Sequence, residues 1–416
     1  MSKSKKILFV SIAWPENGSG NLYKDLMDEF RDHGHQVFVV CNDEKKNHND
    51  QVFNEDGMHV LRVKTAPIRK VNKLKKAHSL STLGTKFKRQ IKRHFNDVRF
   101  DLIITHTPTI TLSGLMNYLK QKNQALFYLL LKDMWPHDQA SLGTIRRKGL
   151  IWHYFRWHEK RIYRYADYIG CMSPGNVRYL LEHNHGIDPG KVEENPNTIH
   201  PRGIGYNNSE LVRSKYNIPV HTTVFIFSGN LSKGHNLEFL IASINALRAY
   251  QHAYFVVGGS GLYFNYLNQR ILDLKLPNIF LYHYLPAEEF KQILSACDVG
   301  LVLLDSRYET PEFPSRLLAY LDAAKPVLCS INQATDIGDI IEKAGCGIST
   351  LNGDFQGFID AIKYLAENRH IRSLMGERAR KLLHQRYLAK FSYDTIHKHL
   401  TNRQSIGHPT MLNCKF

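Results

Sequence analysis

Short apolar segments alternate with helix-like segments along nearly the whole chain, and the alternation restarts after an interruption near the middle. Several of the apolar segments are unbroken runs, which is typical of strands that helices cover on both faces. The pattern predicts parallel α/β sheets. The predicted strands are residues 6–14, 35–42, 58–65, 101–107, 124–132 and 166–173, and then 222–228, 254–258, 278–284, 299–304 and 326–330.

The length of the chain and its composition predict two domains. At 416 residues it exceeds the size that a single core usually reaches. Residues 196–221 are rich in Asn, Pro and Gly and show little periodicity, which is typical of a linker. We therefore predict an α/β fold with two doubly wound, Rossmann-like domains that face each other across a cleft. They would span residues 1–195 and 222–380, with a helical tail at 381–416.

Cysteine usage and hydropathy indicate a cytoplasmic protein. The six cysteines are scattered, with no CxxC pair and no disulfide spacing, which is typical of a reducing compartment. No run approaches 18 apolar residues, so no transmembrane helix is expected. The basic residues before segment 7–14 resemble the start of a signal peptide, but the apolar run is short and ends at Pro15, which favours a first buried strand.

Positive charge is concentrated in the first half of the chain. The net charge is +17, and residues 57–96 hold 12 Lys and Arg and no Asp or Glu. This asymmetry implies an anionic partner, either nucleic acid or the inner face of a membrane. Because no nucleic-acid-binding module is recognisable, we expect no nucleic acid and instead a peripheral position on the anionic inner membrane surface.

Two segments interleave aromatic and basic residues, at 85–95 and at 151–165. In the first, Phe87, Ile91 and Phe95 share one face of a predicted helix. One interpretation places both segments in a membrane interface. The other packs the apolar faces against the sheet and leaves the bases in solvent.

Two loops have the composition of anion sites. Ser315 and Arg316 stand where a polar turn enters a helix, so free N–H groups, the helix dipole and a guanidinium fork converge there. Gly229, Asn230 and Lys233 lie in a second loop, Ser-Gly-Asn-Leu-Ser-Lys-Gly-His, which directly follows an apolar strand. A glycine permits close backbone approach and a lysine neutralises phosphate. Two such loops in one domain predict a nucleoside-diphosphate ligand.

Two further glycine loops are weaker signals. Gly258 lies in Val-Gly-Gly-Ser-Gly after the next strand, where it permits either a tight turn or close ligand approach. Gly18 lies between the first strand and the first helix, where it either contacts a ligand across the cleft or belongs to a capped helix start. Neither loop is a GxGxxG motif, which argues against a dinucleotide-dependent dehydrogenase.

Two side chains at the carboxyl ends of predicted strands are candidate catalytic residues. His106 ends the fourth strand and Asp133 ends the fifth, so both are expected to line the cleft. A carboxylate beside a reacting sugar binds hydroxyls or takes a proton. A lone histidine is more often structural. The histidines form no HExxH motif, and no dedicated metal site is expected.

Together these motifs resemble the family 4 retaining glycosyltransferases of GT-B fold. The likeness is greatest to the bacterial subgroup that builds capsule and O-antigen polysaccharide, including N-acetylfucosamine transferase-like enzymes. It covers nearly the whole chain. The residues that carry it are 228–235, 257–261, 297–302, 314–327 and the Asp-Met-Trp-Pro run at 133–136.

The resemblance implies roles for particular residues. Lys233 and Arg316 would hold the donor diphosphate, and Ser315 would add a hydrogen bond. Backbone at Tyr284 and Leu285 would contact the base. The C-terminal helices would cross back to the first domain.

One departure from the family pattern concerns a pair of glutamates, whose positions fall on Pro311 and Ala319 in this chain. The change at Ala319 removes a carboxylate contact to the ribose. Glu309 and Glu312 lie next to the first position, and Glu312 is the candidate to replace it in sugar binding.

The expected function is the transfer of a sugar, with retention of its anomeric configuration, from a nucleotide-diphosphate donor to a lipid-linked glycan acceptor. The donor nucleotide is expected to be UDP. No tightly bound cofactor is expected. Retention through front-face departure of the leaving group requires no side-chain nucleophile, and none is obvious here. Two alternatives remain open, namely a relative that lost activity with the glutamate pair and acts by binding, and a nucleotide-sugar epimerase of the same architecture.

Overall fold

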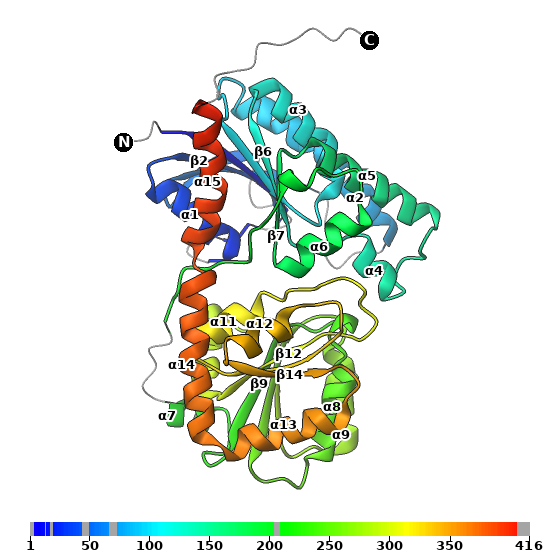
Figure 1. Cartoon of the computed structure of the whole chain (residues 1–416), viewed down its shortest axis with the longest axis vertical. Coiled ribbons are helices and arrows are strands. Elements are labelled where there is room, and N and C mark those ends of the chain that lie inside the picture. The colour runs from blue at the N-terminus through cyan, green and yellow to red at the C-terminus, as the bar shows by residue number, and fades with distance from the viewer. Residues whose placement is uncertain are drawn as a thin grey trace.

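The computed structural model describes residues 4–12, 14–16, 20–43, 50–65, 73–203 and 209–405. Two α/β domains lie one above the other along the long axis of the molecule (Figure 1). The predicted pair of Rossmann-like domains with parallel sheets is confirmed. None of the helices in the described part of the chain is long and apolar enough to cross a bilayer.

The N-terminal sheet has eight strands in the order β3-β4-β2-β1-β5-β6-β7-β8. All neighbours pair in parallel except β3 with β4. The central strands are buried on both faces, and every residue of β6 is buried. The strands are β1 Lys6–Ser11, β2 Gln36–Asp43, β3 Gln51–Glu55, β4 Met58–Lys64, β5 Leu102–His106, β6 Leu126–Leu131, β7 Tyr168–Cys171 and β8 Val192–Glu194.

Helices cover both faces of this sheet. Asn21 caps the first of them by accepting hydrogen bonds from the backbone N–H groups of Tyr23 and Lys24. The helices are α1 Leu22–Asp32, α2 Lys73–His94, α3 Ser113–Asn123, α4 His137–Ser141, α5 Leu150–Tyr165 and α6 Pro174–His183, with 3₁₀ turns η1 Ile110–Leu112 and η2 Pro189–Lys191.

The C-terminal sheet has six parallel strands in the order β11-β10-β9-β12-β13-β14. The strand order reverses between β9 and β12, which is the point where ligands bind in doubly wound sheets. The strands are β9 Thr223–Asn230, β10 Ala253–Ser260, β11 Ile279–Tyr282, β12 Val299–Leu303, β13 Val327–Ile331 and β14 Gly347–Leu351.

The helices of this half end in a long pair that runs along one side of both domains (Figure 1). They are α7 Ser209–Lys215, η3 Lys233–His235, α8 Leu237–Ala246, α9 Phe264–Leu274, α10 Ala287–Ala296, α11 Arg316–Asp322, α12 Ile337–Lys343, α13 Phe355–Glu367, α14 Arg369–Arg386 and α15 Ala389–Ser405. Helix α14 packs on α11, whereas α15 packs on α1 of the N-terminal domain. Tyr393, Ile396 and Leu400 of α15 belong to the N-terminal core.

In the described part of the chain, three strands lie outside the predicted strands and one helix lies inside the predicted linker. Strand β3 forms a hairpin with β4 through Asp56 and Gly57, both at positive φ, and an Asp-Gly pair is a turn signal that the sequence analysis did not use. Strand β8 has three residues and β14 is half polar, so neither forms an apolar run. Helix α7 lies within the segment 196–221 that was interpreted as a linker.

Candidate functional site

A half-buried arginine, Arg316, lies at the point where the order of the C-terminal strands reverses. Arg316 begins α11, and its guanidinium carbon stands 4.3 Å from the ring centroid of Phe227 in β9. Its Nη2 lies 2.9 Å from Nε2 of His235. A Cβ atom built on Gly229 would lie 3.4 Å from Nη2, so this glycine, at φ +132°, lets the strand end approach the cation closely.

The same guanidinium has an unused donor. Nη1 of Arg316 is buried and finds no hydrogen-bond partner among the described residues. Burial lowers the pKa of the guanidinium, and no carboxylate is among the groups that shift it. A buried cation with a free N–H is costly unless an anion completes it. The geometry is therefore that of an anion site.

The other residues of the predicted anion loops are arranged around Arg316 in different ways. Asn230, Lys233, Ser315 and Tyr284 are exposed, so their side chains are accessible to a ligand. Ser315 makes no capping hydrogen bond to α11. Leu285 is half-buried and packs on the C-terminal core.

The structure accounts for one of the two further glycine loops. Gly258 is buried, and a Cβ atom there would overlap the ring of Tyr282 at 2.0 Å, so packing accounts for this glycine. Gly18 lies outside the described residues.

The loop before α11 is held by the N-terminal domain at every second residue. Arg147 pairs with Glu309 at 2.5 Å. Nδ2 of Asn176 donates to the carbonyl oxygen of Pro311 at 2.5 Å, and Nδ2 of Asn197 donates to that of Phe313 at 3.3 Å. The position of this loop, which leads into Arg316, therefore depends on contact between the two domains.

A second cross-domain contact lies beside this loop. The Asp336 carboxylate accepts hydrogen bonds from Ser173 Oγ and from the backbone N–H of Gly175, both at 2.6 Å. Ser173 is the N-cap of α6, so an acid of the C-terminal domain satisfies the start of an N-terminal helix. The domains are thus joined through directional polar contacts.

Three carboxyl groups interact where the domains meet. Burial raises the pKa of Asp133 well above its ordinary value, and Glu312 and Asp138 raise it further. Burial also raises the pKa of Glu312 to about 8, with Asp138 adding to the shift. Glu312 accepts a hydrogen bond from Thr310 Oγ1 at 2.7 Å, and one oxygen of Asp138 has no partner in the described part of the chain. At neutral pH Glu312 therefore holds a proton that an ordinary carboxylate would have lost.

His106 is packed away from the cleft, which corrects the expectation that it lines it. The side chain is only 3% exposed. Its Nδ1 lies 2.8 Å from the Thr107 carbonyl oxygen, and its Nε2 lies 2.8 Å from Ser11 Oγ. Its ring stacks on Tyr23 at 4.1 Å, and burial lowers its pKa to about 4. Asp133, by contrast, is half-exposed and keeps its place at the end of β6.

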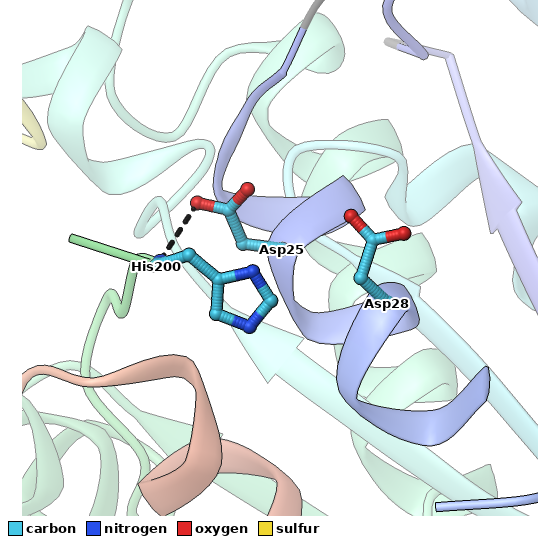
Figure 2. Close-up of side chains that lie close together, drawn as sticks. All are labelled: Asp25, Asp28 and His200. Atoms are coloured by element: carbon cyan, nitrogen blue, oxygen red, sulfur yellow. Dashed lines mark hydrogen bonds between the residues drawn. The ribbon is translucent and has the colours of Figure 1, made fainter. Parts of the chain in front are cut away.

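Asp25, Asp28 and His200 bring ligand-type atoms within 4.8 Å of one another, close enough to hold a metal ion (Figure 2). Protein groups already engage each of them. Asp25 accepts from the His200 backbone N–H and pairs with Arg202 at 2.7 Å, Asp28 pairs with lysine and arginine of α1, and His200 Nε2 lies 2.9 Å from a glutamate of α1. The Arg202 backbone N–H also donates to Asp322 of α11. The cluster therefore anchors the interdomain segment to α1.

Several residues of this site were not identified from the sequence, namely Arg147, Asn176, Asn197, Phe227 and His235. His235 was quoted only as the end of the lysine loop. The contacts of these residues join segments that are far apart in the chain, and no local pattern marks them. Its place at the end of a loop of anion-site composition is the one signal that points to His235.

Two family models match this chain, one in each domain. Residues 16–202 match the family described as Glycosyltransferase Family 4, and residues 208–382 match Glycosyl transferases group 1. The chain is a two-domain glycosyltransferase. No curated protein sequence matches it significantly.

Solved glycosyltransferase structures share this fold at low sequence identity. Sucrose-phosphate synthase from Thermosynechococcus elongatus superposes with a TM-score of 0.76 at 14% identity, over 97% of this glycosyltransferase and 100% of that chain. HepE from Anabaena in complex with UDP-glucose gives 0.70 at 16% identity, over 96% and 100%. WaaG, a glycosyltransferase involved in lipopolysaccharide biosynthesis, gives 0.66 at 14% identity, over 94% and 99%.

Proposed function

We propose that this glycosyltransferase moves a sugar, with retention, from a nucleoside-diphosphate donor to a lipid-linked glycan acceptor. The observation that carries the donor half of the proposal is the buried Arg316 guanidinium with its unused Nη1. Negative charge builds on the leaving diphosphate in the transition state. A preorganised cation stabilises that charge without the reorganisation that bulk water requires. Lys233, which is exposed at the start of η3, adds a second cation.

The donor is proposed to be UDP-linked. HepE, which shares the fold, has been solved with UDP and with UDP-glucose, and this supports the choice of nucleotide. Exposed Tyr284 and half-buried Leu285 follow β11 and offer backbone to the base. Asn230 and Ser315 are proposed as hydrogen-bonding groups around the diphosphate.

Asp133 and Glu312 are proposed to act on the transferred sugar or the acceptor. Because its raised pKa of about 8 keeps a proton on Glu312 at neutral pH, Glu312 can donate as well as accept hydrogen bonds with sugar hydroxyls. The pKa of Asp133 is raised in the same direction, mainly by burial. Front-face departure of the leaving group with retention needs no side-chain nucleophile. The buried position of His106 gives it a supporting role, in which it holds Tyr23 beside Asp133.

Membrane attachment is proposed to use α5 and not the apolar side of α2. Phe87, Ile91 and Phe95 are buried in the N-terminal core, so the apolar stripe of α2 is not available to lipid. We define the α5 face as Leu150, Ile151, Tyr154 and Trp157, all of them exposed, followed by Lys160, Arg161 and Arg164.

An exposed apolar ridge that runs into basic residues fits an anionic bilayer surface. Each Lys or Arg near such a surface contributes about 1 kcal/mol, so a few suffice for reversible binding. The same position would bring the enzyme to a lipid-linked acceptor. The fold shared with WaaG, which acts in lipopolysaccharide biosynthesis, supports an acceptor from surface polysaccharide synthesis.

The second candidate function is a binding protein that has lost transfer activity. The observation that favours it is the replacement of the family glutamates by Pro311 and Ala319. Both candidates predict donor binding, and only the first predicts turnover.

The experiment that tests the proposal is a thermal-shift screen of the protein against nucleotide sugars, followed by assays of donor hydrolysis and transfer. A donor present at 100 times its Kd adds about 2.7 kcal/mol to the free energy of unfolding. We expect UDP-sugars to raise the midpoint temperature of thermal unfolding of the natural protein but not that of Arg316→Ala. If no nucleotide sugar shifts the midpoint, the proposal is wrong. A shift without turnover favours the binding protein.

A further inference from the structure

His235 ends η3 and has a different partner on each ring nitrogen. Nδ1 lies 3.1 Å from the carbonyl oxygen of Leu303, which can only accept, so Nδ1 carries the hydrogen. Nε2 is then an acceptor, and it lies 2.9 Å from Nη2 of Arg316, which can only donate. The partners therefore assign a neutral ring that accepts a hydrogen bond from the arginine.

We propose that His235 is a positioning residue that aims the Arg316 guanidinium at the donor diphosphate. The inference rests on the proposed function, because it assigns a role within the same site. Phe227 covers one face of the guanidinium and Gly229 lies against Nη2, while His235 fixes the direction of Nη2. Nη1 is the donor left unpaired. With the plane of the fork fixed, the two N–H bonds of Nη1 point in fixed directions.

A neutral acceptor suits this role better than an acid. A carboxylate in place of the imidazole would orient Arg316 equally well, but it would neutralise the cation and compete with phosphate. Burial and the positive charge of Arg316 lower the pKa of His235 well below its ordinary range, which keeps the ring uncharged. Arg316 is thus oriented without losing its charge.

The backbone around His235 is itself fixed. The carbonyl oxygen of Gly234 accepts a hydrogen bond from the Asp305 backbone N–H at 2.9 Å. Asn236 caps α8 through its side chain, and its Nδ2 donates to Asn352 Oδ1 at 2.8 Å. A ring carried by an anchored turn holds its partner more closely than one on a free loop would.

Two substitutions separate the proposed role from packing. The carbonyl oxygen of a glutamine occupies the ε position of the side chain, so His235→Gln keeps an acceptor for Arg316. His235→Asn reaches only the δ position, so it keeps a partner for Leu303 and loses the one for Arg316. UDP binding is measured by calorimetry for both variants, for the natural protein and for Arg316→Ala, with the thermal midpoint of each as a folding control.

We expect His235→Gln to bind UDP with a Kd close to that of the natural protein. His235→Asn should bind about 10-fold more weakly, the cost of one hydrogen bond to a charged group. In the Arg316→Ala background the two His235 variants should bind alike, since the group that they position is gone. Equal Kd values for the natural protein and His235→Asn, or equal losses in Gln and Asn, would overturn the inference.

Failure of the proposed function gives a different result. If Arg316→Ala binds UDP as tightly as the natural protein, the diphosphate is not at this arginine, and both proposals are wrong. If Arg316→Ala loses UDP while His235→Asn does not, the anion site stands and only the positioning role of His235 is wrong.

Discussion

The two domains carry opposite electrostatic problems. In the C-terminal domain, Arg316 is a half-buried cation with no acid among the groups that shift its pKa, and its buried Nη1 finds no partner among the described residues. On the N-terminal side, Asp133 and Asp138 are carboxyls whose pKa is raised by burial, and Glu312 of the facing loop adds to the shift in Asp133. This difference is the basis of the proposed substrate assignment, in which an anion binds at Arg316 and sugar hydroxyl groups bind at the carboxyl groups.

The sharpest test of this division is Arg316→Ala. Removing one preorganised donor from a developing oxyanion typically costs on the order of 10²–10³ in rate. We expect a loss of that size in the transfer rate, with weaker donor binding. Initial rates at varied donor concentration measure both. Arg316→Lys is the matched control, and it should recover only part of the rate because a lysine lacks the fork that His235 orients. Full activity in the alanine variant would contradict the assignment.

Asp133→Ala tests the carboxyl groups. A positioned acid or base contributes roughly 10²–10⁴-fold, and we expect a loss near the lower end of that range in transfer. Donor affinity should change by less than about 2-fold, because the diphosphate is assigned to the other domain. Steady-state kinetics and calorimetry with UDP separate the two quantities. If the Asp133 variant lost UDP affinity in proportion to its transfer rate, the assignment of the diphosphate to the C-terminal domain would be wrong.

The exposed α5 face provides a prediction about the outer surface of the N-terminal domain. Trp157→Ala should weaken binding to anionic vesicles about 10-fold, because burial of a large apolar side chain contributes about 1.5–3 kcal/mol. Vesicle sedimentation measures the effect, and added salt should weaken binding of the natural protein. Lys86→Ala in α2 is the control for simple charge loss. Binding that is equal on neutral and anionic vesicles would reject the proposed surface.

A further prediction concerns how the Glu312 carboxyl group makes the stability of the protein depend on pH. Burial raises the pKa of Glu312 from 4.5 to about 8, so the folded protein holds a proton that the unfolded chain releases. Its contribution is full below pH 4.5 and is lost as pH rises to about 8, at most about 1.4 kcal/mol per pH unit. Glu312→Gln should therefore flatten the decline of the thermal midpoint between pH 5 and 8. Parallel curves for the variant and the natural protein would show that Glu312 ionises normally.

Much of the fold was predictable because buried parallel strands leave unbroken apolar runs in the sequence. Strand β14 and the hairpin strand β3 escaped because half-polar segments carry no such signal. Arg316 and Lys233 could be named as candidates because loop composition marks a possible anion site locally. Asn176 and His235 were not, since each acts through a residue more than 80 positions away.

Helices α2 and α5 show why local pattern alone could not settle the surface. Both interleave aromatic and basic residues at helical spacing. Phe87 and Ile91 of α2 are buried against the sheet, whereas Leu150 and Trp157 of α5 remain exposed. Whether the apolar face of each helix is buried depends on the elements that pack against that helix. The sequence of the helix alone does not specify these elements.

The most direct measurement of the central claim is a crystal structure of this glycosyltransferase with UDP bound. The account predicts a phosphate oxygen within hydrogen-bonding distance of Arg316 Nη1, with the His235 contact at Nη2 intact and the base beside Tyr284. A diphosphate bound elsewhere, with Nη1 still unpaired, would contradict it.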